Sequence, residues 1–436
     1  MKIEQTLFLL LITLNLHALS LDEAIATAQK NSLDMKKLSM NIEIAKASIK
    51  EKQSSHFGRV DLLASYTHYN LPRTLTPLTP ASIAGGAASI PTTQDMMVAG
   101  VSYRVDLFTG MSDTRSIEIA DIQKSMAKNL QQISSEQLTY NVTTLYINIL
   151  ATNSKIEAQK EYVQALQRLY ENIELKVKLE KLSKIDALKS LAELSRAKSN
   201  LTSLITNRDI LKDTLATTMN VPSISKLEEL SIEVKDFDTQ FSQYEEKLMK
   251  TKKLEISRES IQKSIKQEQK ASAMYYPKIS FNGYYGQSAG VNDDTNPKSG
   301  DFNNEEVWQA GVDLKWNIFD FGKTSALNQK SKIAIMQAKL EKSKTKRELQ
   351  RSLREALSKI NLAISSYHSA SVEHSLMQET QKIEQIRYDN GASDINDLLY
   401  TKARYQLANS AYITSKYDYQ NTINYLNYLL EQGNKK

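Results

Sequence analysis

Two carboxylates lie three residues apart, shortly after an isolated glycine, in the stretch IRYDNGASDINDLLY. They are Asp394 and Asp397, and Gly391 is the only glycine between positions 322 and 433. If several copies of the chain brought these carboxylates into a confined space, the negative charge would favour a cation, and the carboxylates would repel one another. A second interpretation is that both are solvated residues at a helix start, where the helix dipole favours acidic side chains. The glycine is typical of a left-handed helix cap.

Other groups that could do chemistry do not assemble into a site. Residues 322–324 read GKT, like the end of a phosphate-binding loop, but the glycine needed five residues earlier is Asn317. His368 and His374 are six residues apart, which places them on different faces of a helix and makes them a poor metal pair. No hydrolase-like arrangement stands out. We therefore predict no enzyme activity, no metal and no cofactor, and an exported enzyme lacks a candidate site.

Composition narrows the class of protein further. Charged residues make up 24% and aromatic residues 7% of the 436 positions. This leaves little hydrophobic material for several compact cores and favours an elongated fold. The net charge of +6 comes without a dense basic run, so nucleic acid is not an expected partner. The chain has no cysteine, which excludes disulfides, thiol chemistry and a lipid-modified cysteine.

The first 20 residues predict a secretory signal peptide. Lys2 precedes an apolar run from Leu7 to Leu16, and Ala18 and Ser20 supply small residues at the −3 and −1 positions of a cleavage site. The alternative is a buried N-terminal helix. Because no later segment offers about 20 uninterrupted apolar residues, a helical transporter of the inner membrane is not expected.

Glycine and proline are concentrated in two windows, 57–110 and 277–322, so long helices are predicted elsewhere. Two helices of about 100 Å are expected, Ser112 to Glu180 and Lys323 to Asn390. Helices of this length need partners, which favours coiled-coil packing against shorter helices. Those are expected at about 21–55, 183–220, 244–275 and 392–432.

The two windows alternate apolar and polar residues, as strands do. The regular strands are 101–108 and 308–318, and their partners are 60–69 and 279–287, each about 10 residues long, enough for a tilted strand to cross a bilayer. The polar face, predicted to line a barrel, is Arg104, Asp106, Asp313, Lys315 and Asn317. The apolar face, predicted to meet lipid, is Val101, Tyr103, Val105, Leu107, Trp308, Val312, Leu314 and Trp316. The alternative is a soluble hairpin packed on a helix.

The order of elements occurs twice. Residues 101–108 align with 312–319 at a shift of 211, and Lys181 to Leu188 align with Gly391 to Leu398 at a shift of 210. We predict a first repeat at 21–222, a connecting segment at 223–243, a second repeat at 244–432 and a tail at 433–436. Four strands cannot close a barrel, so membrane strands require an oligomer whose number the residues leave open.

These features resemble the TolC family of outer membrane efflux proteins. The resemblance rests on LDEAIATAQKNSLDM near the start, LFTG and IFDFGK where strands pass into long helices, and RYDNGASDINDLL at the second helical turn. It implies an α+β membrane protein in which three chains build a 12-stranded β-barrel, each giving four strands, continued by a long α-helical coiled-coil barrel. It also implies a periplasmic tunnel whose tip opens when an adaptor and an inner-membrane transporter dock.

The resemblance also assigns roles to the turns. Tyr388, Gly391 and Asp397 match a tip pattern of tyrosine, turn glycine and constricting aspartate, whereas Ser393 stands where an arginine occurs and Tyr400 where a second aspartate occurs. The predicted tip and gate are Tyr388, Gly391, Ser393, Asp394, Asp397 and Tyr400. The predicted adaptor contacts are Lys181, Leu182, Ser183, Asp186, Gly391 and Ala392, with Lys181 in place of the first turn's glycine.

The sequence thus predicts a homotrimeric exit duct in the outer membrane of a Gram-negative bacterium, serving a tripartite efflux pump or type I secretion. Its expected partners are outer-membrane lipid, a periplasmic adaptor and a transporter of the RND, ABC or MFS class. The cargo stays open. The competing interpretation is an exported coiled-coil scaffold without a pore, which would be soluble without detergent.

Overall fold

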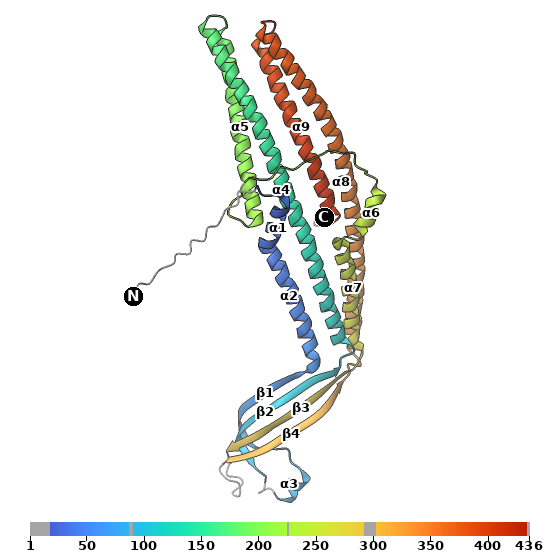
Figure 1. Ribbon diagram of the computed structural model, residues 1–436. Helices are drawn as coiled ribbons and strands as arrows, with labels where there is room; N and C mark the ends of the chain where they lie inside the picture. Colours follow the sequence, from blue (N-terminus) through green and yellow to red (C-terminus); the bar gives the residue numbers. More distant parts are fainter. Residues whose placement is uncertain (1–17, 87–89, 225, 292–301, 434–436) are drawn as a thin grey trace, which may run out of the picture. The chain divides into compact units, whose positions relative to one another are not determined.

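The computed structural model describes residues 18–86, 90–224, 226–291 and 302–433, and only the backbone of 302 and 303 (Figure 1). Residues 1–17 of the predicted signal peptide lie outside the described residues. The chain divides into two compact units. The helical unit comprises Met1–Ser39, Asn129–Glu255 and Lys344–Lys436, and the sheet unit comprises Met40–Lys128 and Ile256–Ser343.

Two helices of equal length dominate the chain, as the segregation of glycine and proline predicted. They are α4 (Ser112–Lys178) and α8 (Lys323–Asp389), each 67 residues long. The shorter helices are α1 (Leu21–Asn31), α2 (Leu33–Ser54), α3 (Pro80–Ala84), α5 (Lys184–Met219), α6 (Phe241–Met249), α7 (Lys252–Ser272) and α9 (Ile395–Leu429). Short 3-10 turns at Ser55–Phe57 and Ala273–Tyr275 precede strands. Among the described residues, no helix is apolar enough over a sufficient length to cross a membrane.

Two segments that were predicted as single helices are each broken. The helix expected at 21–55 ends at Ser32, whose hydroxyl accepts a hydrogen bond from the Met35 N–H (3.3 Å) and so begins α2. The helix expected at 244–275 is divided into α6 and α7. The Glu431 carboxylate accepts from the backbone N–H groups of Lys252 and Lys253 at 2.6 and 3.2 Å, which caps α7. Side-chain capping groups therefore start new helices where no glycine or proline marks a break.

Four strands form one antiparallel sheet in the order β1-β2-β3-β4. They are β1 (Arg59–Thr74), β2 (Thr92–Phe108), β3 (Lys278–Val291) and β4 (Phe302–Lys315). The strands are longer than the predicted 10 residues because backbone pairing continues into polar segments. At the other end of β4 the prediction was wrong, since the strand stops at Lys315 and leaves Trp316 and Asn317 outside it.

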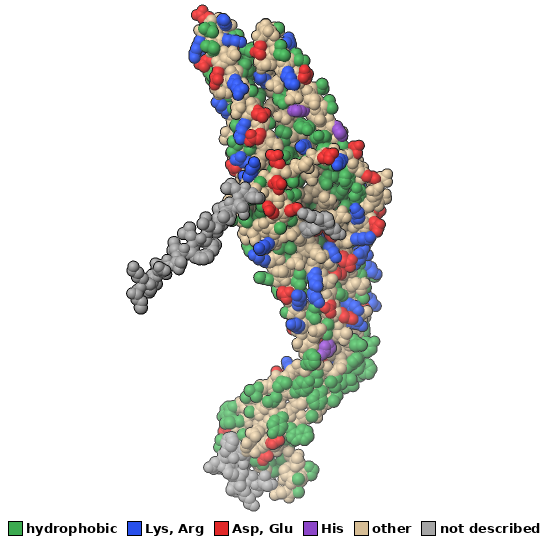
Figure 2. Space-filling view, in the orientation of Figure 1, with side chains coloured by type: hydrophobic (Ala, Val, Ile, Leu, Met, Phe, Trp, Pro, Cys, Tyr) green, Lys and Arg blue, Asp and Glu red, His purple; other side chains and the backbone are tan. Residues whose placement is uncertain are grey.

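The register separates the two faces of the sheet. Leu62, Val101, Tyr285 and Trp308 lie opposite one another in one row across all four strands. The rows of this face from here to the end of β4 are also largely apolar, and hydrophobic side chains gather over the strands in Figure 2. Within the described residues β1 and β4 are open edges of the sheet. One chain therefore presents an apolar sheet face together with two unpaired strand edges.

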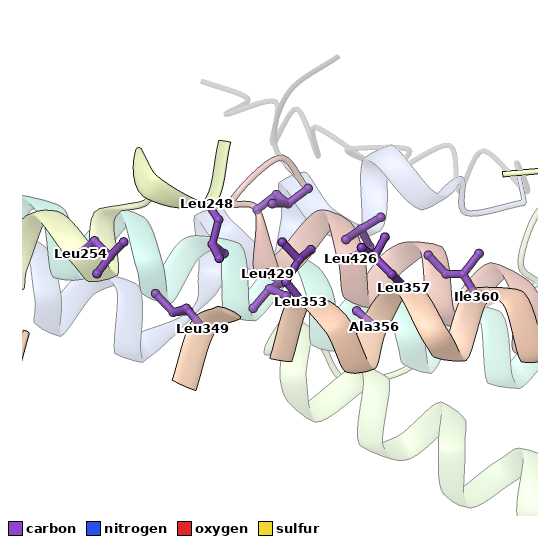
Figure 3. Packing of buried hydrophobic residues seen from close by; sticks show 10 residues of the cluster. Leu248, Leu254, Leu349, Leu353, Ala356, Leu357, Ile360, Leu426 and Leu429 are labelled. Carbon is purple, nitrogen blue, oxygen red and sulfur yellow. The ribbon is translucent and has the colours of Figure 1, made fainter. Parts of the chain in front are cut away.

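The helical unit holds three buried apolar clusters. One joins Leu248 of α6, Leu353 and Ile360 of α8 and Leu426 of α9 (Figure 3). A second packs α1 and α5 on α4 around Tyr146, and a third joins α4, α5 and α9 around Leu166 and Leu398. Because Leu353 and Ile360 are fully buried, truncating either to alanine should cost about 2–5 kcal/mol.

The backbone repeats with a constant shift of 211 residues. Both long helices begin and end at this shift, and so do eight of the ten residues with a positive φ among the described residues. The pairs are Gly110 with Phe321, Met111 with Gly322, Glu180 with Gly391, and Asn220 with Glu431. Both copies thus use the same turn geometry with different residue types.

Candidate functional site: the two helical turns

The first turn, between α4 and α5, is closed by backbone and side-chain hydrogen bonds. Glu180 has a φ of 60°, and the Lys181 N–H donates to the Lys176 carbonyl at 2.8 Å. Ser183 caps α5, because its hydroxyl accepts from the Ile185 N–H, while the Asp186 carboxylate accepts from the Ser183 N–H, each at 3.3 Å. Of the predicted adaptor contacts in this turn, Ser183 and Asp186 form a capping box.

The second turn, between α8 and α9, has the same backbone. Gly391 has a φ of 73°, and the Ala392 N–H donates to the Arg387 carbonyl at 2.8 Å. The alignment of Lys181 with Gly391 was therefore wrong by one residue. Glu180 holds the left-handed position in the first turn, and Lys181 corresponds to Ala392.

Asp394 is the N-cap of α9. Its carboxylate accepts from the backbone N–H groups of Asp397 (3.0 Å) and Asn396 (2.7 Å), and these bonds lower the pKa of Asp394 below its usual value. Of the two interpretations given for these aspartates, the one that places them at a helix start is therefore correct for Asp394. The Asp397 side chain is exposed one turn into the helix. Of the two carboxylates, Asp397 has the side chain available to an ion.

Tyr388 lies where the two turns meet. Its ring packs with the cluster around Leu166 and Leu398, the Lys176 ammonium lies 5.3 Å from the ring centroid, and its hydroxyl is buried without a hydrogen-bond partner among the described residues. Burial raises the pKa of Tyr388, and the nearby carboxylate of Asp186 in the first turn adds to this rise. The predicted gate residue Tyr388 therefore contacts residues of both hairpins.

A direct polar contact also joins the two hairpins. Lys189 of α5 donates to the Asn396 side-chain oxygen of α9 at 2.9 Å. Figure 1 shows both turns at the same end of the helical unit. The remaining gate residue, Tyr400, is exposed and accepts from Arg404 at 3.2 Å.

Three charged residues near the second turn were missed by the sequence analysis. Glu384 is only 7% exposed, and its carboxylate accepts from the Ser393 hydroxyl and from Arg387 at 3.0 Å. Arg387 in turn donates to the Ala392 carbonyl at 3.4 Å. Lys402 is buried on α9, and burial lowers the pKa of its ammonium. Glu384 and Lys402 face the interior of the helical packing, where charged residues are rare.

The polar face of the sheet carries a second set of predicted residues. Arg104 donates to the Asn282 side-chain oxygen at 2.7 Å, and the Asn282 amide donates to Asp313. Asp106 pairs with Lys278 at 2.9 Å. Lys315 lies opposite Lys278 in register. Basic and acidic groups therefore alternate over this face.

Two members of the predicted apolar face depart from the alternation. Leu107 falls at an irregularity in the β2–β3 register, between the paired residues Asp106 and Phe108. Trp316 lies beyond β4, and its indole N–H donates to the Tyr275 carbonyl at 3.1 Å. The register of β2 and β4 places the other predicted residues of this face, Val101, Tyr103, Val105, Trp308, Val312 and Leu314, on one side of the sheet.

No cluster of three or more His, Asp or Glu side chains suited to a metal ion occurs in the part of the chain that the structure describes. His374 instead stacks on Tyr412, with ring centroids 5.1 Å apart.

Comparison with known proteins identifies the family. Residues 24–220 and 248–431 match the outer membrane efflux protein family. The fold is similar to the CmeC outer membrane channel of Campylobacter jejuni, with a TM-score of 0.78, 18% identity and coverage of 95% of this chain and 86% of that chain. It is also similar to the open state of the MtrE outer membrane channel of Neisseria gonorrhoeae, with a TM-score of 0.77, 17% identity and coverage of 95% and 89%.

The outer membrane protein VceC of Vibrio cholerae has the same fold, with a TM-score of 0.76, 13% identity and coverage of 94% and 96%. The comparison with curated proteins gives no match. These likenesses confirm the predicted TolC-like fold of long helices and a four-stranded sheet. The family match covers most of the chain, and the chain belongs to the outer membrane efflux protein family.

Proposed function

We propose that three copies of this chain form a passive exit duct through the outer membrane of a Gram-negative bacterium, with a helical tunnel in the periplasm. The observation that carries the proposal is the sheet, which has an exposed apolar face, a charged opposite face and two open edges. An open edge cannot face lipid, so the edges must pair with other copies. Three copies would supply 12 strands, with β4 of one copy beside β1 of the next.

In this arrangement the apolar face meets lipid, and Arg104, Asp106, Asp313 and Lys315 line the barrel together with the neighbouring Asn317. Alternating charges of both signs suit a water-filled passage for varied cargo. A duct of this kind moves cargo passively, so a partner must supply the energy. We infer that this partner is an inner-membrane transporter of the RND, ABC or MFS class, joined by a periplasmic adaptor.

The two helical turns are the proposed gate and docking end. Asp397 from three copies would form a ring of carboxylates, while Asp394 holds α9 in place as its cap. Tyr388 and the Lys189–Asn396 contact tie the two hairpins together. An adaptor that binds the exposed residues Lys181 and Ala392 could separate the hairpins and open the tip.

Extraction and native mass measurement test the proposal. The duct predicts that the exported protein leaves the membrane fraction only with detergent, runs as a heat-modifiable oligomer and has the mass of three chains. A non-pore scaffold predicts release into the soluble periplasmic fraction without detergent. Recovery of a soluble single chain would refute the duct.

A further inference from the structure

A groove of about 880 Å³ lies between α8 and α9 in the helical unit, and Tyr140 of α4 also lines it. Small side chains create the space. On α8 these are Ala356, Ala363 and Ala370, which recur every seven residues and so lie in line on one face of the helix. The volume and the largely apolar lining are typical of sites for small organic molecules.

The groove carries a carboxylate and an ammonium at opposite ends. Asp418 comes from α9 and Lys359 from α8. Because the two helices run antiparallel, Lys359 lies level with Tyr425, whereas Asp418 lies level with Ser366. On each helix these two levels are seven residues apart, which corresponds to about 10.5 Å. The groove thus has an acidic end and a basic end with an apolar stretch between them.

Both charged groups lack a partner. Among the described residues, neither Asp418 nor Lys359 forms an ion pair or a side-chain hydrogen bond, and both side chains are open to solvent. The walls of the groove partly desolvate the Asp418 carboxylate and raise its pKa, and the charge of nearby Lys155 offsets only part of this rise. A carboxylate in such surroundings is stabilised by an added cation.

A second acceptor lines the groove one turn from Asp418. The Asn421 side-chain amide donates to the Asn148 side-chain oxygen at 2.9 Å, but the Asn421 side-chain oxygen is buried without a donor among the residues that the structure describes. An unpaired buried acceptor is destabilising, so a donor supplied by a ligand is favoured here. An ammonium group carries three N–H donors and suits both acceptors.

Tyrosine rings form the other end of the groove. Tyr140 packs edge-on against Tyr425, with centroids 5.9 Å apart, and stacks on Tyr428 at 4.9 Å. Leu362 is 67% exposed and also lines the groove. Aromatic and aliphatic walls of this kind favour a flat apolar body.

The groove opens on a face of the α8–α9 pair that the segment between α5 and α6 leaves uncovered. That segment packs elsewhere, because Asn361 donates to the Thr239 hydroxyl at 3.0 Å and Tyr419 donates to the Lys235 carbonyl at 3.4 Å. Both donors lie on other helix faces than the groove residues. In a trimeric duct, three such segments would obstruct the passage if they lay inside it. They therefore belong on the outside, and the groove faces the passage.

We propose that this groove binds zwitterionic organic molecules that have an apolar aromatic body and an ammonium and a carboxylate about 10 Å apart. The ammonium donates to Asp418 and Asn421, the body lies along the alanines of α8, and the carboxylate meets Lys359. The groove is thus a contact site for cargo inside the duct. This proposal rests on the proposed function, because it requires the groove to face the passage.

Three matched compounds test the charge pattern by calorimetric titration of the detergent-extracted oligomer. The first is a biphenyl with an aminomethyl group at one end and a carboxylate at the other. Its methyl ester keeps only the ammonium, and the analogue with methyl in place of aminomethyl keeps only the carboxylate. The zwitterion should bind about tenfold more tightly than either analogue, as one added ion pair of about 1.4 kcal/mol predicts.

Substitutions at the two ends should remove separate parts of this preference. Asp418→Asn should abolish the advantage of the zwitterion over the carboxylate-only compound. Lys359→Gln should abolish its advantage over the ester. Glu373→Gln, which removes an exposed carboxylate on α8 away from the groove, is the control and should change neither ratio.

Ser366→Phe tests the space itself, because it fills the groove from an exposed position and should weaken binding of all three compounds. Equal affinity for the three compounds in the wild type, unchanged by Ser366→Phe, would reveal nonspecific apolar contact and overturn the proposal. If none of the compounds binds the oligomer, another copy of the chain covers the groove, and the proposal is also overturned.

Single-channel recording separates this proposal from the duct. The zwitterion should cause brief reductions of current in the wild type, and these should become several-fold rarer in Asp418→Asn. Channels that conduct without such reductions would retain the duct and refute the cargo site. A folded oligomer that binds the zwitterion with the expected preference but never conducts would refute the duct and leave the groove as a binding site only.

Discussion

Glu180 and Gly391 occupy the same left-handed position in two copies of one helical turn, with φ values of 60° and 73°. In each copy the next residue donates its N–H back to the carbonyl five residues earlier, at 2.8 Å. The two turns therefore share a backbone while only one has the residue that this backbone favours.

The shared turn predicts opposite effects for two substitutions. Glu180→Gly should stabilise the protein by about 1 kcal/mol per chain, because glycine adopts a positive φ without the steric cost of a side chain. Gly391→Ala should destabilise it by a similar amount. Thermal unfolding in detergent measures both. Lys181→Gly is the control, since no positive φ is found at Lys181, and a stabilisation there instead of at Glu180 would restore the alignment shifted by 210 residues.

The two aspartates of the second turn should differ in their effect on ion flow. Asp397→Asn should weaken the block of single-channel current by divalent cations, because it removes the exposed carboxylate of the proposed ring. Asp394→Asn should leave the block nearly unchanged, since asparagine also caps a helix and the Asp394 carboxylate is engaged by backbone N–H groups. Equal block in the wild type and in Asp397→Asn would remove the gate assignment.

Lys402 should make stability depend on pH. Burial lowers its pKa below the usual 10.5, so the folded state disfavours the charged form. The destabilisation is present at low and neutral pH and is relieved as pH rises through the lowered pKa of the folded state. Lys402→Met keeps the length of the side chain without the charge and should raise the melting temperature at neutral pH.

The difference in melting temperature between the wild type and Lys402→Met should shrink as the pH approaches 10.5, the usual pKa of lysine. Nearby Asp389 acts in the opposite direction by raising the pKa of Lys402. A Lys402→Met protein that melts below the wild type at neutral pH would show that the ammonium makes a favourable contact in the assembled protein.

The start of the mature chain provides a further prediction. The small residues Ala18 and Ser20 favour cleavage after Ser20. In the fold, however, the Leu19 N–H donates to the Lys226 carbonyl at 2.8 Å, and Ser20 and Glu23 form the capping box of α1. Cleavage after Ala18 would keep both contacts, so we expect the mature chain to begin at Leu19. N-terminal sequencing of the exported protein decides between Leu19 and Leu21.

Much of the helical architecture could be predicted from where glycine and proline are absent. The start of α4 and α8 was predicted correctly and their ends to within two residues, because breakers define long helices well. The strand ends were less predictable. The ladder from Thr92 to Met97 pairs through backbone groups, whatever the polarity of the side chains.

The site was harder to predict than the fold. Matching Lys181 to Gly391 compared residue types, but the turn is defined by φ, which a glutamate can adopt at a cost. Glu384 and Lys402 were missed, since no local sequence pattern reveals that both lie inside the helical packing. The family resemblance predicted the position of the turn. It did not show that Asp394 caps the helix while the side chain of Asp397 stays exposed.

Single-channel recording in a planar bilayer tests the central claim most directly. The purified, detergent-extracted full chain should insert without a partner and give discrete conductance steps, and Asp397→Asn should change their sensitivity to divalent cations. If a correctly folded, oligomeric preparation gives no conductance in either form, the chain is not the duct that its sheet and helical turns indicate.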